Sequence, residues 1–339
     1  MRLPTTATVH EAAVRIRGHV LRTPVLRSDW ADARLAPGTM AFFKAEHLQW
    51  TGSFKLRGAV NAIFSLSNEE ARRGVCAHSS GNHAAAVACA AASRSIPCTI
   101  VVPRGTPQAK QDNAAAYGAT IVVCEPTQQA RRQTVIEQAA RMGGAVLIHP
   151  YDDALVISGQ GTMALELLEQ CSDVDAIIVP TSGGGMISGI ALAAAPFGVR
   201  VYAAEPLGKR LGEALSTGAR VVDPASADAP LETIADAIRT RPLGETAWAL
   251  RRLIEPTVLS VGDAQLRAAM RTMATQMKQM VEPAGALALA AMMTPAFRAE
   301  QELAEAQGRP IRRVAAIICG GNIDLASWGS LVSGGVYRS

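Results

Sequence analysis

The sequence predicts an α/β protein with largely parallel sheets. Short apolar runs of strand length alternate with alanine-rich, helix-like segments through most of the 339 residues. Parallel strands need long crossover connections, usually helices, and this alternation supplies them. Because 49% of the residues are hydrophobic and only 4% are aromatic, the core is expected to consist mainly of aliphatic side chains.

The expected strands are short apolar runs bounded by turn residues. In chain order they lie at residues 40–44, 98–102, 120–124, 176–179, 200–203, 257–261 and 314–318. The expected helices are the longer segments between them. They lie at residues 58–65, 84–92, 109–117, 131–141, 162–170 and 263–280. The polar segment 299–308 is expected to be a surface helix, and the stretch 223–230 an exposed loop.

Charge and composition exclude several classes of protein. Lysine and arginine exceed the acidic residues by only four, and no run of five like charges occurs, which disfavours a nucleic-acid partner. No stretch reaches the roughly 18 apolar residues of a membrane span, and no secretion signal is recognisable. The six cysteines lack metal-like spacing, so we expect reduced thiols in a cytoplasmic protein.

Lys55 is the first residue with a predicted chemical role. It lies between Phe54 and Leu56 at the start of a helix-like segment. Burial and the positive end of the helix dipole both lower the pKa of a lysine in this position. A neutral amine can form a Schiff base or act as a base. The alternative is a surface lysine that opens a helix.

A glycine loop follows the predicted strand at 176–179. Residues 182–186 read Ser-Gly-Gly-Gly-Met and lead into an alanine-rich helix. Consecutive glycines allow backbone N–H groups to converge on an anion. The loop lacks the Gly-Lys-Ser/Thr ending of a nucleoside triphosphate site, so a phosphate monoester fits it better. The alternative is a flexible turn.

A polar turn, residues 79–83, opens another alanine-rich helix. Its sequence, Ser-Ser-Gly-Asn-His, offers hydroxyls, an amide and backbone N–H groups to a carboxylate or a polar ring substituent. A simple capped turn explains it equally well. The segment 159–164 matches a relaxed dinucleotide fingerprint, but no convincing strand precedes it, and we therefore predict no dinucleotide site there.

The motifs together resemble those of the fold-type II pyridoxal-phosphate enzymes, in the branch of threonine/serine dehydratases and serine racemases. The matching segments occur in the family's order at residues 51–58 (TGSFKLRG), 79–83 (SSGNH), 149–153 (HPYDD), 182–186 (SGGGM), 201–206 (VYAAEP), 281–285 (VEPAG) and 319–322 (CGGN). The resemblance implies a tryptophan synthase β-like fold of two interleaved three-layer α/β/α domains. A small mobile domain, residues 75–151, would be inserted into a large cofactor-binding domain formed by residues 1–74 and 152–339.

The resemblance also assigns roles to individual residues around pyridoxal 5'-phosphate. Lys55 matches the Schiff-base lysine, and Asn82 matches the amide that binds the 3-oxygen of the cofactor. Cys319 lies where many relatives have a serine facing the pyridine nitrogen, although a buried strand-end thiol is the alternative. The phosphate cup would consist of Ser182, Gly183, Gly184, Gly185 and Met186.

A second set of residues would bind the substrate. Its carboxylate would be held by the turn of Ser79, Ser80, Gly81, Asn82 and His83. Arg131 aligns with an arginine that closes on this carboxylate in the racemase branch, or it is an ordinary helix residue. Ser80 matches the acid/base that racemases use on the face opposite the lysine; helix capping would explain the same serine.

The resemblance implies β-elimination from a small 3-hydroxy amino acid (threonine, serine or 3-hydroxyaspartate), giving a 2-oxo acid and ammonia. The first alternative is a serine or aspartate racemase on the same scaffold. The second is a non-catalytic protein that binds a phosphate ligand. A homodimer with neither nucleic-acid nor membrane partners is expected.

One departure from the family concerns its divalent-cation site. Glu205 is retained, but Lys209 and Leu211 replace the later ligand positions. We therefore predict no structural metal, and the Lys209 ammonium could take the place of the cation. The roles of Trp50 and Arg241 stay open: Trp50 could line the substrate entrance or pack between domains, and Arg241 could meet a second carboxylate or lie in solvent.

Overall fold

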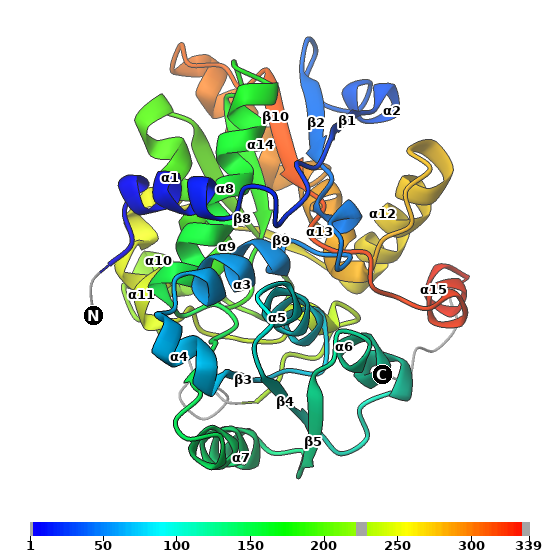
Figure 1. The fold of residues 1–339 in the computed structure, drawn as a ribbon. Helices are drawn as coiled ribbons and strands as arrows, with labels where there is room; N and C mark the ends of the chain where they lie inside the picture. Colours follow the sequence, from blue (N-terminus) through cyan, green and yellow to red (C-terminus); the bar gives the residue numbers. More distant parts are fainter. Residues whose placement is uncertain (1–2, 222–228, 334–339) are drawn as a thin grey trace.

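The computed structural model describes residues 3–221 and 229–333, which form two mostly parallel sheets (Figure 1). Within this part of the chain, the larger sheet has six strands in the order β1-β2-β10-β7-β8-β9. They are β1 (Val25–Arg27), β2 (Met40–Lys44), β10 (Arg313–Ile317), β7 (Ala176–Pro180), β8 (Arg200–Pro206) and β9 (Leu259–Val261). Only β1 runs antiparallel to its neighbour. The predicted α/β class is confirmed.

The second sheet has four parallel strands in the order β5-β4-β3-β6. They are β5 (Thr120–Cys124), β4 (Cys98–Pro103), β3 (Val75–His78) and β6 (Val146–Leu147). All four fall in one continuous stretch of chain, whereas the six-stranded sheet takes strands from before and after it. This order is what an inserted unit produces, although the domain boundaries at residues 75 and 151 stay a prediction.

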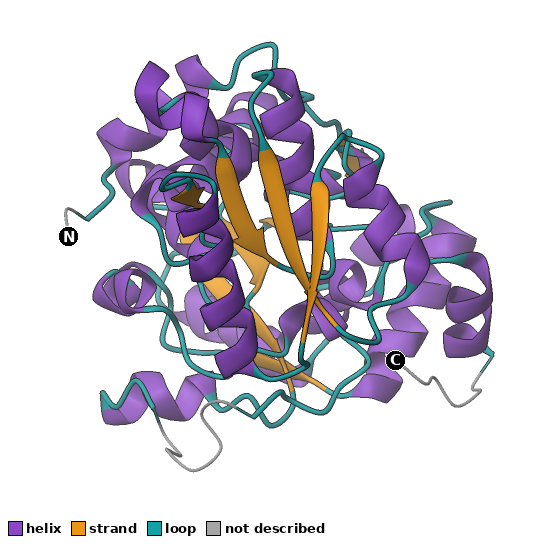
Figure 2. Ribbon diagram, turned by 60° about the horizontal axis from the view of Figure 1, so that its bottom comes forward, coloured by secondary structure: helices purple, strands orange, loops and turns teal. Residues whose placement is uncertain are grey.

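Fifteen α-helices connect the strands in the described residues, and Figure 2 shows the strands enclosed by them. They are α1 (Thr6–Arg15), α2 (Asp29–Asp32), α3 (Lys55–Phe64), α4 (Asn68–Arg73), α5 (Asn82–Ser93), α6 (Gln108–Ala115), α7 (Gln128–Arg141), α8 (Ala154–Gln170), α9 (Gly185–Ala194), α10 (Leu211–Thr217), α11 (Glu245–Ala249), α12 (Asp263–Gln276), α13 (Pro283–Met292), α14 (Pro295–Ala306) and α15 (Leu325–Val332). Helix α3 contacts α8 on the side of the larger sheet and α5 on the side of the smaller one.

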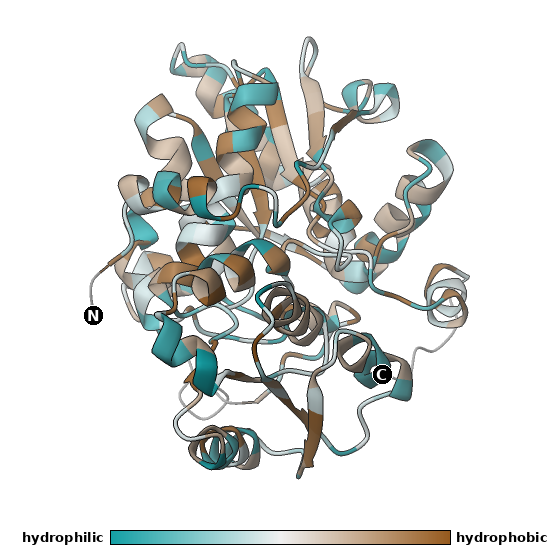
Figure 3. Cartoon of the chain, in the orientation of Figure 1, coloured by the Kyte–Doolittle hydropathy of each residue, from teal (hydrophilic) through white to brown (hydrophobic). Residues whose placement is uncertain are grey.

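The four-stranded sheet is covered on both faces. Along β3, Val75 and Ala77 belong to the apolar cluster that includes α5, whereas Cys76 belongs to the cluster that includes Val135 of α7. Successive side chains of a strand point to opposite faces, so α5 and α7 lie on opposite faces of this sheet. Figure 3 shows hydrophobic residues on the strands, whereas the outer helix α4 is mostly hydrophilic.

Glycines allow the helices α3, α8 and α9 to pack closely against one another. A Cβ atom at Gly159 of α8 would lie 2.6 Å from the Arg57 carbonyl oxygen of α3, and one at Gly161 would lie 2.5 Å from the Gly189 carbonyl oxygen of α9. Both glycines lie inside α8, not in a turn between a strand and a helix. The dinucleotide-like segment is therefore a helix-packing feature.

Several elements differ from those expected. The strands β1, β3 and β6 were not predicted, because each is short and carries few β-branched residues. Helix α14 is not a wholly exposed polar helix: it begins at Pro295, before the expected segment, and buries Phe297 and Ala304. Residues 223–228 of the expected loop lie outside the described residues. No described helix is long and apolar enough to cross a membrane.

Candidate functional site

Lys55 begins helix α3 next to the chain that leaves strand β10. Ser53 forms an isolated antiparallel bridge with Gly320, and the Phe54 amide donates a hydrogen bond to the Cys319 carbonyl oxygen at 3.1 Å. These contacts place the first residue of α3 beside Cys319. Two predicted site residues from distant parts of the sequence therefore lie close together.

The Lys55 amine lies in surroundings that favour its neutral form. Its Nζ donates to the Pro150 carbonyl oxygen at 2.6 Å, and the side chain is only partly exposed. Burial lowers the pKa of Lys55 to about 8. The alternative of an ordinary surface lysine does not describe this environment.

A buried charge network fixes the first turn of α3. Arg57 is fully buried and donates through Nε to Glu46 Oε2 at 2.8 Å and through Nη1 to Glu166 Oε1 at 2.7 Å. The buried Lys44 donates to the other oxygen of Glu166 at 2.7 Å. Since each buried charge has a partner of opposite sign, the network holds the helix that carries Lys55 in one position.

Cys319 follows strand β10 and is 4% exposed. Its Sγ donates to the Ala284 carbonyl oxygen at 3.3 Å, and burial raises the pKa of the thiol well above its usual value. The thiol therefore stays protonated and neutral at physiological pH. A neutral group of this kind can pair with an unprotonated ring nitrogen.

The glycine loop after β7 is tightly packed. A Cβ atom at Gly183 or Gly185 would lie within 2.4 to 2.6 Å of Tyr151, and one at Gly184 would lie 2.6 Å from Ala247. Gly184 also has a φ of 92°, a conformation that favours glycine. These contacts contradict the alternative of a flexible turn.

The backbone amides of the loop are available to a ligand. Within the described chain, no N–H group of residues 182–186 donates a hydrogen bond to a protein acceptor. Residues 183–186 are buried, and a buried donor without a partner costs about 1–3 kcal/mol. The loop also leads into the N-terminus of α9, which favours negative charge. Buried, unpaired amides at this position fit a phosphate group.

Asn82, the first residue of α5, is held by two residues that the sequence analysis did not assign to the site. Its Nδ2 donates to Glu282 Oε1 at 2.8 Å, and its Oδ1 accepts from Asn322 Nδ2 at 2.7 Å. A Cβ atom at Gly320 would lie 2.4 Å from Glu282 Oε1, so this group of residues adjoins Cys319. Glu282 and Asn322 both lie in matched motifs, which is the signal that could have identified them.

Ser80 has a free hydroxyl in an open turn. The N-cap of α5 is Gly81, and no side chain caps this helix. The capping interpretation of Ser80 is therefore wrong. No side-chain hydrogen bond of Ser80 occurs in residues 3–221 or 229–333, and a Cβ atom at Gly81 would meet nothing within 4 Å. The Ser80 hydroxyl is thus without a protein partner, on a half-buried residue next to the open space at Gly81.

His83 and Arg131 differ in how they relate to this turn. The His83 imidazole is buried and bonded to the Ile148 carbonyl oxygen at 2.9 Å, and burial lowers its pKa to about 3. Only the His83 backbone is therefore available at the turn. Burial and the charges of Arg131 and Arg132 lower the pKa of His78, so Arg131 lies near the end of β3 that enters the turn.

Lys209 lies beside Glu205 in a buried polar cluster. Its Nζ donates to the carbonyl oxygens of Thr240 and Arg241 at 2.7 and 2.5 Å. Glu205 accepts from the Leu211 amide and the Ser260 hydroxyl, each at 3.0 Å. The ammonium thus supplies positive charge next to Glu205. The described residues contain no group of three or more His, Cys, Asp or Glu side chains that could hold a metal ion.

The two residues whose roles stayed open are both at the surface. The Arg241 guanidinium donates to the carbonyl oxygens of Ala229 and Gly208 at 3.1 and 3.0 Å, so it fastens two loops to each other. Trp50 is 54% exposed, which is more than packing between two domains would leave.

The site lies at the carboxyl ends of parallel strands. Ser79 follows β3, the glycine loop follows β7 and Cys319 follows β10. Ligands of α/β proteins usually bind at this edge. The sequence-predicted residues Lys55, Asn82 and Cys319 therefore share one region, with the phosphate-sized cradle on an adjacent strand.

Comparisons with known proteins support this interpretation. A family model described as "Pyridoxal-phosphate dependent enzyme" matches residues 16–320. The chain is 41% identical to serine racemase of Arabidopsis thaliana over 330 residues, covering 96% of each chain. It is 38% identical to beta-hydroxyaspartate dehydratase of Paracoccus denitrificans, covering 96% of this chain and 98% of that one. The solved structure of maize serine racemase is similar with a TM-score of 0.89 and 40% identity, covering 98% of both chains.

Proposed function

Because the chain belongs to the family of pyridoxal-phosphate dependent enzymes, we propose that it is an ammonia-lyase for a small 3-hydroxy amino acid. It eliminates the β-hydroxyl of threonine, serine or 3-hydroxyaspartate, and hydrolysis then gives a 2-oxo acid and ammonia. One observation carries the proposal: an amine with a pKa of about 8 lies beside Asn82 and a neutral Cys319, at the sheet edge that also holds the unpaired amides.

The residues fit the family's cofactor. The buried amides of residues 183–186 lack protein acceptors, and the glycines leave a cradle that side chains would fill. We assign the phosphate to residues 182–186, the 3-oxygen to Asn82, the ring nitrogen to Cys319 and the covalent link to Lys55. When bound, the cofactor withdraws electrons from the α-carbon of the substrate. The neutral Cys319 makes it a weaker electron sink than an acidic partner would.

Lys55 would move the α-proton. With its pKa lowered to about 8, a substantial fraction of the free amine is neutral near that pH. A base whose pKa lies near the working pH is effective in proton transfer. The network around Arg57 fixes the helix that carries the amine, and the turn at Ser79 to His83 would hold the carboxylate of the substrate. Arg131, near the end of β3, would assist in closing on it.

The test is a panel of 3-hydroxy amino acids. Purified holoenzyme incubated with threonine, serine and the 3-hydroxyaspartate isomers should release 2-oxo acid from at least one of them. Lys55→Ala should abolish release, while Arg22→Gln, a change in an exposed ion pair, should not. Full turnover by Lys55→Ala would refute the assignment. Cofactor binding with no product from any substrate would instead favour the non-catalytic alternative.

A second candidate, racemisation, is favoured by the free hydroxyl of Ser80. A group that neither caps α5 nor bonds within the described chain is available as an acid, on the face that the family resemblance puts opposite Lys55. Chiral chromatography of serine and aspartate incubated with the enzyme would detect inversion. Ser80→Ala should remove inversion while elimination continues; equal inversion by both proteins would exclude this role.

We also propose that the enzyme is a cytoplasmic homodimer, as the resemblance implies. Light scattering of the holoenzyme should give a mass near twice that of the 35.5 kDa chain. A monomeric mass would contradict this.

A further inference from the structure

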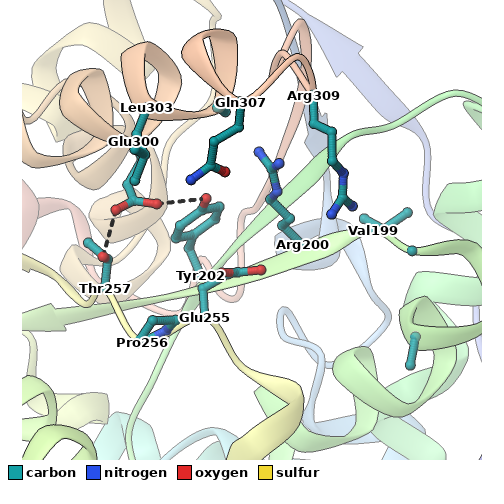
Figure 4. A pocket seen from close by; sticks show the side chains of 13 residues that line it. Val199, Arg200, Tyr202, Glu255, Pro256, Thr257, Glu300, Leu303, Gln307 and Arg309 are labelled. Atoms are coloured by element: carbon teal, nitrogen blue, oxygen red, sulfur yellow. Dashed lines mark hydrogen bonds between the residues drawn. The ribbon is translucent and has the colours of Figure 1, made fainter.

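A second cavity lies at the opposite edge of the six-stranded sheet from Lys55 and the glycine loop. It has a volume of about 460 Å³ and includes Arg200, the first residue of β8, and Arg309, which follows α14 (Figure 4). Arg200 pairs in register with Ala176, the first residue of β7, whereas the glycine loop follows the last residue of β7. At about 3.3 Å per residue, the length of β7 separates the two sites by roughly 15 Å.

The floor of this cavity is ordered by hydrogen bonds. Glu300 accepts from the Tyr202 hydroxyl at 3.1 Å and from the Thr257 hydroxyl at 2.6 Å. Tyr202 is 1% exposed and packs edge-on against Phe297, with ring centroids 5.8 Å apart. Both oxygens of Glu300 therefore have partners, and the floor is fixed by contacts on two sides.

The other charged groups of the cavity have no such partners. Figure 4 shows the side chains of Arg200, Gln307 and Arg309 extending toward the same space. Neither guanidinium makes a hydrogen bond or ion pair with another described residue, and the Glu255 carboxylate also makes none there. Burial raises the pKa of Glu255 and the charges of Arg200 and Arg309 lower it, so the three charged groups face one another across the cavity without direct contact. Two guanidiniums and one carboxylate are thus available to a ligand within a cavity of the size that small molecules occupy.

We propose that this cavity is a second binding site, for a free α-amino acid. The ligand carboxylate binds Arg200 and Arg309, and its ammonium group binds Glu255. The four charged side chains, these three and Glu300, sum to zero, which matches a zwitterion better than a phosphate or a polyamine. Leu303 also lines the cavity and offers an apolar surface to a small side chain of the ligand.

The experiment is a titration of the holoenzyme with L-alanine, which has no β-hydroxyl to eliminate. Calorimetry measures total binding, and the absorption of the cofactor reports only the ligand that reaches the active site. We expect two equivalents per chain by calorimetry and one by absorption. The double variant Arg200→Gln/Arg309→Gln should keep the absorption change and lose the second equivalent. The control Arg298→Gln, from an exposed ion pair on α14, should keep both.

L-lactate and inorganic phosphate test the chemical class. Lactate has a hydroxyl in place of the ammonium group, so it should bind the second site at least about tenfold more weakly than L-alanine, and Glu255→Gln should remove that difference. Phosphate binding as tight as that of L-alanine would overturn the assignment in favour of a simple anion site. A single equivalent by both methods in the unmodified enzyme would overturn the second site altogether. Neither result depends on which substrate the active site turns over.

Discussion

Replacing Lys209 by methionine should weaken both the fold and the cofactor site. The variant keeps the length of the side chain but removes the ammonium that donates to the Thr240 and Arg241 carbonyl oxygens. Glu205, which is 3% exposed, keeps its bonds from the Leu211 amide and the Ser260 hydroxyl but loses the positive charge near it. The two carbonyl oxygens lose their donor, and each unpaired buried polar group costs about 1–3 kcal/mol, so we expect a loss of about 2–5 kcal/mol in the free energy of unfolding.

The effect should reach the glycine loop through the segment that Lys209 holds. The Gly244 amide donates to the Gly183 carbonyl oxygen at 2.9 Å, and Leu243 lies where a Cβ atom of Gly184 would point. If the carbonyls at 240 and 241 lose their donor, this segment loosens and the phosphate cradle loses support. We expect the affinity for the cofactor to fall about tenfold, equivalent to about 1.4 kcal/mol.

Urea unfolding of the holoenzyme measures the stability, and fluorescence titration of the cofactor-free protein measures the affinity. Arg22→Gln, from an exposed ion pair, is the control and should change stability by less than about 1 kcal/mol. In Lys209→Ala, the Glu205 carboxylate and the carbonyl oxygens of Thr240 and Arg241 form a set of oxygen ligands. Millimolar Ca²⁺ should therefore raise the urea midpoint of that variant but not that of the unmodified enzyme. The reasoning is refuted if Lys209→Met is as stable as the unmodified enzyme. It is also refuted if a chelator inactivates the unmodified enzyme, because that enzyme would then depend on a metal ion.

Three further predictions concern other buried groups. Burial raises the pKa of Glu282 to about 8, so between about pH 4.5 and 8 the folded cofactor-free protein holds a proton that the unfolded chain has lost. The free energy of unfolding should therefore fall by about 3–5 kcal/mol as the pH rises through this range. Glu282→Gln should flatten the dependence of the urea midpoint on pH, and an unchanged slope would contradict the assignment. Gly183→Ala places a Cβ atom 2.4 Å from Tyr151, so the affinity for the cofactor, measured by titration, should fall at least about tenfold. An unaltered affinity would mean that the loop can move aside. Arg57→Met leaves the buried Glu46 without its ion-pair partner and Glu166 with Lys44 alone, so it should lower the free energy of unfolding in urea by about 3–5 kcal/mol. A loss below about 1 kcal/mol would show that the network does not hold α3.

The strands were more predictable than the helices. All seven expected strands are present, with ends shifted by three residues or fewer. Helix α8 begins eight residues before the expected segment, and its Gly159 and Gly161, residues of low helix propensity, serve a close crossing of helices. Helix α13 was missed since all ten of its residues are buried and no polar face marks its period.

The chemistry of the site was more predictable than its supporting contacts. Lys55 and the glycine loop carry local signals, an apolar setting at a helix start and consecutive glycines after a strand. The partners of Asn82 lie in matched motifs, but no local pattern predicts their contact with it, since Glu282 lies 200 residues away along the chain. The role of Ser80 as a helix cap was wrong because Gly81, not Ser80, precedes the first helical residue. Side-chain partners of this kind depend on tertiary packing.

The crossing of α3, α8 and α9 has a consequence for how this protein tolerates mutation. Gly58, Gly159, Gly161 and Gly189 each lie where a methyl group would meet another helix or a side chain at less than 3 Å. In a saturation-mutagenesis map these four positions should be as intolerant as Lys55, although none of them faces a reacting group. The loss would appear as reduced yield of folded protein and not as a change in turnover per folded molecule. Measuring abundance and activity separately would therefore divide the intolerant positions of this chain into those that build the scaffold and those that perform the reaction.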